Sequence, residues 1–151
     1  MKSTLLLGLF LMAGYISKAQ SDKMVKWNYT VKKVAEKTYE VHMTANIEHN
    51  FHMYAQNVGV EGPLPTTFTF TKSPAIILDG KVKEQGKLIR KFESAWNGNA
   101  SYYEKNVNFI QVVKLKHDLK TNFKGKVEFM VCDDKKCLLP SNIDINVNVG
   151  G

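Results

Sequence analysis

A period-two alternation of apolar and polar residues runs through most of the chain after position 26. Trp27, Tyr29 and Val31 alternate with polar neighbours. Successive side chains of a strand point to opposite faces, so this pattern predicts half-buried strands. The same alternation recurs at Tyr39 to Ile47, Thr66 to Phe70, Val107 to Leu115, Val127 to Val131 and Ile143 to Val149. No segment of helical periodicity and length competes with these strands.

Turn signals separate the predicted strands. They are Glu61-Gly62-Pro63, Asp79-Gly80, Asn97-Gly98 and Lys124-Gly125. Glycine and asparagine supply the positive φ, and proline the fixed φ, that tight turns require. Short strands at roughly ten-residue spacing predict an all-β antiparallel sandwich over residues 27–149. Residues 20–26 are expected to form a flexible N-terminal segment.

The first 19 residues have the pattern of a secretory signal peptide. Lys2 precedes an apolar run from Leu5 to Ile16. In Ser17-Lys18-Ala19, small residues stand at the third and first positions before a cleavage site that precedes Gln20. A run of about 12 residues is too short to span a bilayer, which disfavours the alternative of an uncleaved anchor. We therefore expect export to the periplasm and one domain with no membrane span after cleavage.

The charge of the chain does not indicate nucleic-acid binding. Removal of residues 1–19 takes away two lysines and no acid, so the formal charge falls from +7 to +5. The remaining lysines are scattered along the sequence, whereas a nucleic-acid footprint is clustered. We expect the scattered lysines to lie on a solvated surface. We also expect the protein to be a monomer.

The two cysteines, Cys132 and Cys137, lie at the end of a predicted strand and flank the polar turn Asp133-Asp134-Lys135-Lys136. They are close enough to bond to each other. Alternation places Cys132 on the face opposite Val127 and Val131, so it is not an ordinary core cysteine. A ring this small contributes only about 2 kcal/mol of stability in the loop-entropy model. A redox-active pair and a passive hairpin disulfide both remain open.

A metal site is a weaker interpretation. Structural zinc needs four ligands, so a single cysteine pair would have to recruit two histidines. The spacing of His42, His49, His52 and His117 does not suggest such a site. We expect neither a metal nor a small-molecule cofactor.

The segment from Lys91 to Tyr103 departs from the strand pattern. Its aromatic residues, Phe92, Trp96, Tyr102 and Tyr103, are interleaved with small and polar residues. The segment is predicted to be a long loop, and loops of that length in a compact domain are often functional. Packing of Trp96 on the sandwich edge is an equal alternative. Stacking of exposed aromatics on sugars is a more remote one.

Several short motifs, taken together, resemble one family. They are Phe51-His52-Met53-Tyr54-Ala55-Gln56, Gly62-Pro63-Leu64-Pro65-Thr66, Glu84, Phe92, and Val131-Cys132 with Cys137-Leu138-Leu139-Pro140. From about Trp27 to Val149 the chain resembles the N-terminal periplasmic domain of the thiol:disulfide interchange protein DsbD, including short stand-alone relatives called disulfide bond corrector proteins. The resemblance implies an immunoglobulin-like sandwich whose cysteine pair is covered by a cap loop.

The resemblance also implies roles for individual residues. Cys137 would attack and carry the mixed disulfide, and Cys132 would resolve it. Phe92 or Trp96 would cover the pair, with His52 and Tyr54 flanking the thiols. By strand parity, His52 and Tyr54 lie opposite Phe51 and Met53, so one set is expected in the core and the other exposed.

The chain departs from the family pattern in two ways. Four residues separate its cysteines where the best-known relative has five, and Leu139 stands where proline is common. The transmembrane and thioredoxin-like portions of full-length DsbD are absent from this sequence, so electrons are expected from a separate protein.

Two functional hypotheses follow. The first is an exported carrier that passes electrons from a membrane donor to disulfides of thioredoxin-like or misoxidised proteins. The second is a β-sandwich binding or assembly module with a passive hairpin disulfide.

Overall fold

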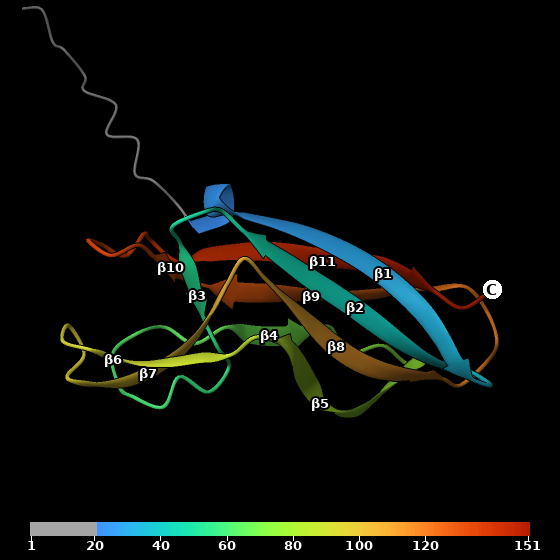
Figure 1. Cartoon of the computed structure of the whole chain (residues 1–151). Coiled ribbons are helices and arrows are strands. Elements are labelled where there is room, and N and C mark those ends of the chain that lie inside the picture. Colours follow the sequence, from blue (N-terminus) through green and yellow to red (C-terminus); the bar gives the residue numbers. More distant parts are fainter. Residues whose placement is uncertain (1–20) are drawn as a thin grey trace, which may run out of the picture.

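The computed structural model describes residues 21–151, whose regular secondary structure is almost entirely β-strand (Figure 1). No helix within this range is long and apolar enough to cross a membrane. The elements are a 3-10 helix η1 (Ser21–Met24) and the strands β1 (Val25–Ala35), β2 (Thr38–Ile47), β3 (His52–Tyr54), β4 (Thr67–Phe70), β5 (Ile76–Gly86), β6 (Ile89–Glu93), β7 (Gly98–Glu104), β8 (Asn106–Leu115), β9 (Thr121–Phe129), β10 (Val131–Cys132) and β11 (Ser141–Val149).

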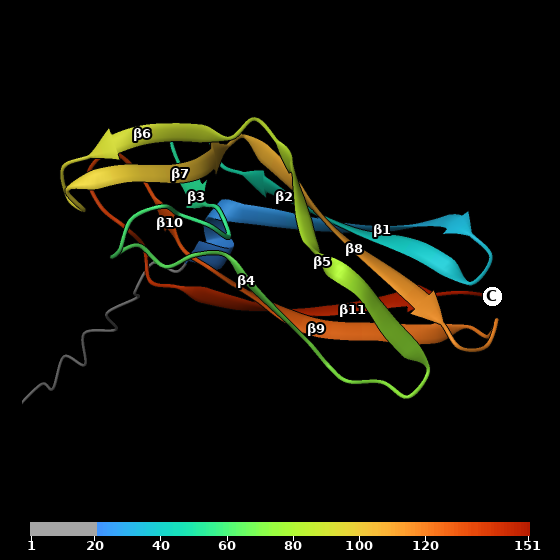
Figure 2. The same ribbon diagram turned by 90° about the horizontal axis from the view of Figure 1, so that it is seen from below.

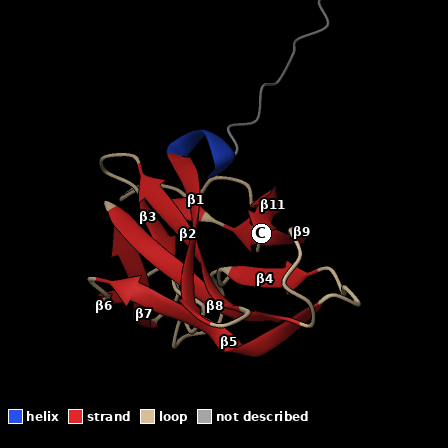
Figure 3. Ribbon diagram, turned by 90° about the vertical axis from the view of Figure 1, so that its right-hand side faces the viewer, coloured by secondary structure: helices blue, strands red, loops and turns tan. Residues whose placement is uncertain are grey.

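Two antiparallel sheets face each other across the main core. One has the order β1-β2-β8-β5 and the other the order β11-β9-β4. Figure 3 shows the two layers end on. Along β2 every second residue is buried, as the alternation predicted, and β8 and β9 follow the same rule. The expected antiparallel sandwich is confirmed.

A third sheet, with the order β10-β3-β7-β6, extends the first sheet at one end of the molecule (Figure 2). Its strands follow or precede those of the first sheet along the chain: β3 follows β2, β6 follows β5, and β7 leads into β8. Asn50 and Lys105 have positive φ at two of these junctions. Strand β10 therefore takes the edge position that β1 occupies in the first sheet.

Strand β10 reaches that edge by crossing between sheets. It follows β9 after the single residue Met130, yet β9 pairs with β11 and β4, whereas β10 pairs with β3. Val131 points into the main core, while Met130 and Cys132 belong to a second apolar cluster. The opposite-face placement predicted for Cys132 is thus confirmed, and that face is itself covered.

The main core is rich in aromatic contacts. The ring of Trp27 packs against Phe68, Phe109 and Phe129, with ring centroids 5.5 to 6.4 Å apart. Such pairs add to the free energy gained by burying apolar area. This core holds the two sheets together and leaves the third sheet to carry the cysteines.

Three local expectations were wrong. Residues 21–26, expected to be flexible, form η1 and the start of β1, and Ser21 is fully buried by contacts with distant segments. The predicted loop from Lys91 to Tyr103 is a hairpin of β6 and β7 joined by the turn 94–97, because Asn97, with positive φ, lets the chain reverse.

The predicted signal peptide lies outside the described residues.

The third correction concerns two of the predicted turns. Asp79-Gly80 lies inside β5, where the register shifts and Gly80 has φ of 74°. Lys124-Gly125 lies inside β9, where a Cβ at Gly125 would come within 2.6 Å of the Thr69 carbonyl oxygen. Glycine inside a strand marks a bulge or the close approach of another backbone, and these two glycines serve those purposes.

Candidate functional site

The cysteines close a short hairpin at the end of the molecule opposite the C-terminus (Figure 1). Cys132 and Cys137 are antiparallel bridge partners joined by a disulfide, with their Cα atoms 3.9 Å apart. At the next pair of residues away from the turn, the Leu138 amide donates a hydrogen bond to the Val131 carbonyl over 2.9 Å. The sulfurs therefore bond across a regular turn.

Asp133 organises the tip of this hairpin. Its carboxylate accepts hydrogen bonds from the amides of Lys135 and Lys136, at 2.7 and 2.8 Å. These backbone hydrogen bonds lower the pKa of Asp133. Aspartate commonly stabilises tight turns in this way, so the acidic start of the turn has a structural purpose.

The two cysteines have different surroundings. Cys132 is 2% exposed and packs with Met130, Tyr54 and Tyr102 in the second cluster. Cys137, on the outer arm of the hairpin, is exposed. An incoming thiolate therefore meets Cys137 first.

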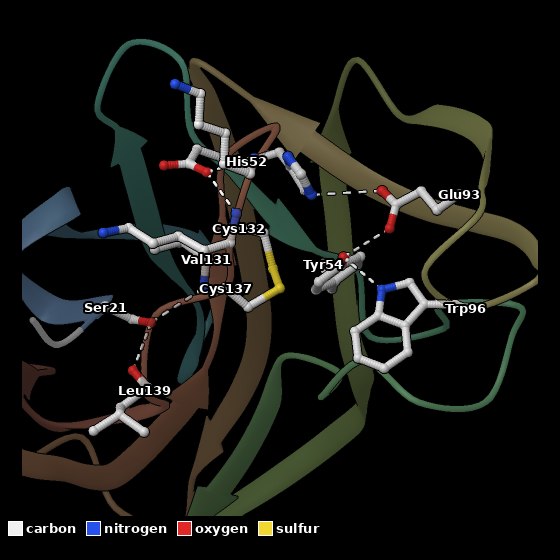
Figure 4. The surroundings of a disulfide bond; sticks show 12 residues. Ser21, His52, Tyr54, Glu93, Trp96, Val131, Cys132, Cys137 and Leu139 are labelled. Carbon is white, nitrogen blue, oxygen red and sulfur yellow. Dashed lines mark hydrogen bonds and ion pairs between the residues drawn. A yellow bond between two sulfur atoms is a disulfide. The ribbon is translucent and has the colours of Figure 1, made fainter.

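Ser21 fixes the base of the hairpin (Figure 4). Its hydroxyl donates to the Leu139 carbonyl over 2.8 Å and accepts from the Val131 amide over 3.1 Å. Its own amide also donates to Leu139. One buried serine thus joins both arms of the cysteine hairpin to the start of β1.

His52 and Tyr54 come from β3, the strand beside β10. His52 is the cross-strand partner of Cys132, and Met53 is the partner of Val131. The expectation that one parity would be exposed was wrong, because Met53 and Tyr54 are both buried. The reason is that Val58, Val60 and Leu64, from the segment 55–66, join the cluster on the outer face of the third sheet.

A hydrogen-bonded chain links this strand to the β6–β7 hairpin (Figure 4). The Tyr54 hydroxyl donates to Glu93 Oε2 over 2.9 Å and accepts from Trp96 Nε1 over 3.2 Å. Burial is the main cause that raises the pKa of Tyr54, so its hydroxyl stays protonated and donates. The other carboxylate oxygen, Glu93 Oε1, lies 3.5 Å from His52 Nε2.

A pocket of about 470 Å³ lies beside the disulfide and brings together the six residues that the sequence predicted for the site. Trp96 is half-buried in its wall, whereas Phe92 is 57% exposed. Trp96 therefore covers the interior of the site and Phe92 presents its ring to solvent. The six predicted site residues that line the pocket are Cys132, Cys137, His52, Tyr54, Phe92 and Trp96.

Sequence reasoning missed Glu93, the one carboxylate that the Tyr54 hydroxyl contacts. A signal was present, since Glu93 is the only acid within the aromatic segment 91–103. Glu84, quoted in the family motif, lies elsewhere: it accepts hydrogen bonds from the Tyr103 hydroxyl and the Gln56 amide, at 2.8 and 2.7 Å. It thereby anchors the start of the segment 55–66.

The sugar-stacking alternative loses support in the structure. Tyr102 and Tyr103 are 5% and 3% exposed, so they offer no platform for a sugar ring. Among residues 21–151 no group of three or more His, Cys, Asp or Glu side chains could hold a metal ion.

Comparison with solved structures supports the fold. The N-terminal domain of DsbD from Neisseria meningitidis, in its reduced form, matches with a TM-score of 0.56 and 13% identity over 86% of this chain and 89% of that one. The N-terminal periplasmic domain of ScsB from Proteus mirabilis matches with a TM-score of 0.58 and 15% identity over 84% of this chain and 46% of that one. At such identities the likeness shows the fold alone, an immunoglobulin-like antiparallel β-sandwich.

Comparison of sequences identifies the family. No curated protein matches the chain. The family model described as thiol:disulfide interchange protein DsbD, N-terminal, matches residues 20–148. That range contains both cysteines and every strand except the last residue of β11. The chain belongs to the family of the DsbD N-terminal domain, a thiol:disulfide interchange domain.

Proposed function

We propose that this protein is an exported redox carrier. Its Cys132–Cys137 pair accepts two electrons from a membrane donor and passes them to disulfides of thioredoxin-like or misoxidised proteins. The observation that carries the proposal is the contrast between an exposed and a buried cysteine in one disulfide beside a pocket. Thiol-disulfide exchange requires one accessible sulfur and a second thiol close enough to resolve the mixed disulfide.

Loading begins at the exposed sulfur. A thiolate of the donor attacks Cys137 Sγ, the Cys132–Cys137 bond breaks, and its electron pair stays on Cys132 Sγ. The second thiol of the donor then attacks the mixed disulfide and releases Cys137. The donor leaves as a disulfide, and the two released sulfurs of this chain take up one proton each.

Unloading reverses these roles. The thiolate of Cys137 attacks a disulfide of the recipient, and one recipient sulfur leaves with the electron pair of the broken bond. Cys132 then attacks Cys137 Sγ, reforms the internal disulfide and releases the second recipient sulfur. Cys137 is thus the attacking residue and Cys132 the resolving one.

The aromatic residues of the pocket control access in this proposal. Trp96 is held by Tyr54 and by the backbone of Gly62, so it forms a fixed wall. Phe92 is exposed, and a docking partner would contact its ring before the disulfide. His52 and Tyr54 flank the sulfurs from β3. Restricted access protects reduced thiols from unwanted oxidation.

The periplasm is the compartment that fits this chemistry. Disulfides form and persist outside the cytoplasm, and residues 1–19 have the pattern of a signal peptide. The related ScsB domain is described as periplasmic. We propose that residues 1–19 are removed on export and that the protein acts as a monomer.

Trapping of mixed disulfides tests the proposal. In cells, a Cys132→Ser variant retains the attacking thiol but cannot resolve, so it should accumulate mixed disulfides with its partners. The matched Cys137→Ser variant keeps only the buried thiol and should trap few. Equal recovery of partners from both variants, or recovery from neither, would contradict the assigned roles.

A further inference from the structure

His52 has an unsatisfied polar atom next to the buried cysteine. It is the cross-strand partner of Cys132 on one side and of Glu104 on the other. Its ring stacks on Tyr102 at 4.4 Å between centroids. Its Nε2 atom is buried and makes no hydrogen bond, because the carboxylate oxygen that faces it, Glu93 Oε1, lies 3.5 Å away, too far for a good one. Buried polar atoms are nearly always paired, so an unpaired one in a pocket calls for an explanation.

His42 provides a comparison within the same protein. It lies on β2, in the first sheet, and both of its ring nitrogens have partners: Nε2 is 3.0 Å from Glu40 Oε2 and Nδ1 is 2.9 Å from the Asn108 side-chain nitrogen. A structural histidine here is therefore fully hydrogen-bonded. His52 differs because its Nε2 makes no hydrogen bond and has only the more distant carboxylate of Glu93, at 3.5 Å.

The charged groups around His52 come from three elements. Glu93 on β6, Glu104 on β7, and Asp133 and Asp134 in the cysteine turn all favour its protonated form. Burial opposes them and has the larger effect, so the pKa of His52 lies below its ordinary value. Three lysines also line the pocket. These are Lys91, Lys135 and Lys136. The imidazole is thus neutral at pH 7 while the disulfide is intact.

We propose that His52 is the proton acceptor for Cys132 and that Glu93 holds the resulting imidazolium. The inference rests on the proposed function, because it concerns the resolving step of the same cysteine pair. A neutral imidazole beside a buried thiol can act as a general base, as imidazole does for nucleophilic cysteines elsewhere. The 3.5 Å separation of His52 Nε2 and Glu93 Oε1 becomes an ion pair once the proton arrives.

The step balances in atoms and electrons. Cys132 Sγ loses its proton to the imidazole as it attacks Cys137 Sγ. The bond between Cys137 and the partner sulfur breaks, and its electron pair leaves with that sulfur as a thiolate. The imidazolium then gives its proton to this thiolate or to water, which restores neutral His52.

A two-step release assay separates the resolving step from the attack. The reduced protein reacts with 5,5′-dithiobis(2-nitrobenzoate): attack by Cys137 releases the first thionitrobenzoate, and resolution by Cys132 releases the second. In His52→Gln we expect the second release at pH 7 to slow on the order of 10²-fold, with its pH profile moved toward the ordinary thiol pKa of about 8.5. The first release should be unchanged.

Controls make the outcome specific. His42→Gln should leave both releases as in the wild type. Glu93→Gln should slow only the second, and by less than His52→Gln does.

The failures can be told apart. A second release in His52→Gln that matches the wild type in rate and pH profile would overturn the assignment of His52 while leaving the carrier function intact. Absence of the second release in the wild type would overturn the carrier function, and the assignment of His52 with it.

Discussion

The indole ring of Trp96 lies against the backbone of Gly62, in the space that a Cβ would occupy. Gly62 has φ of 124°, a conformation open in practice only to glycine. The turn 94–97 and the segment 55–66 are therefore in direct contact, and Val60 packs over Gly98 in the same way. Displacement of Trp96 from the site would require both segments to move.

A Gly62→Ala substitution should open this contact. The new methyl group would overlap the indole, and the backbone strain alone costs about 1 to 3 kcal/mol. We expect lower stability in urea and loss of the Trp96 to Tyr54 hydrogen bond, seen as a shifted indole N–H resonance. Gly80→Ala is the matched control, because φ is positive there but nothing lies within 4 Å. An unchanged indole resonance in Gly62→Ala would contradict the packing described.

A Ser21→Ala substitution should loosen the cysteine hairpin. It removes a hydroxyl that bonds to both Val131 and Leu139, and the buried Val131 amide loses this acceptor. The expected loss is about 1 to 3 kcal/mol of unfolding free energy, with faster hydrogen exchange at the Val131 amide. Ser73→Ala removes a single half-buried hydrogen bond and is the control. Equal losses in the two variants would show that Ser21 does not clamp the hairpin.

The two cysteines should differ in reactivity when each is left alone. In Cys132→Ser the remaining thiol is exposed, and in Cys137→Ser it is 2% exposed. Each 1.4 kcal/mol needed to open the buried site slows its alkylation about tenfold. Iodoacetamide should therefore modify Cys137 in Cys132→Ser at least about tenfold faster than Cys132 in Cys137→Ser. In urea, where both variants are unfolded, the two rates should agree. Equal rates in the native state would refute this expectation.

The stability of the oxidised protein should fall as the pH drops below about 6.5. Burial lowers the pKa of His52 in the folded state, so the unfolded chain binds more protons in this window. Stability then rises with pH wherever the unfolded state holds more protons. Urea unfolding at pH 7.5 and pH 5.5 should show a larger loss for the wild type than for His52→Gln. The lowered pKa of Asp133 acts in the same direction only near pH 4 and below.

Much of the fold was predictable because most strands bury one face. Tyr39 to Ile47 shows why: each alternate residue points into a single core, so period two is visible in the sequence. The alternation gives the wrong prediction at β3, where Met53 and Tyr54 are both buried. A second apolar cluster covers the outer face there, and parity no longer separates core from surface.

The cysteine pair was predictable from local spacing, but its surroundings were not. His52 and Cys132 become neighbours only because β10 leaves the sheet of β9 and pairs with β3. Glu93 joins the site through Tyr54, and Ser21 through Val131 and Leu139. These contacts depend on the register of strands that lie far apart in sequence, which local patterns do not encode.

The reduction potential of the Cys132–Cys137 couple tests the central claim most directly. Equilibration of the purified protein with glutathione buffers, followed by alkylation of free thiols, gives the value. A carrier should fall in the range of known carriers, about −270 to −120 mV. A value below about −300 mV, typical of structural disulfides, would contradict the carrier function and favour a binding module with a passive clip.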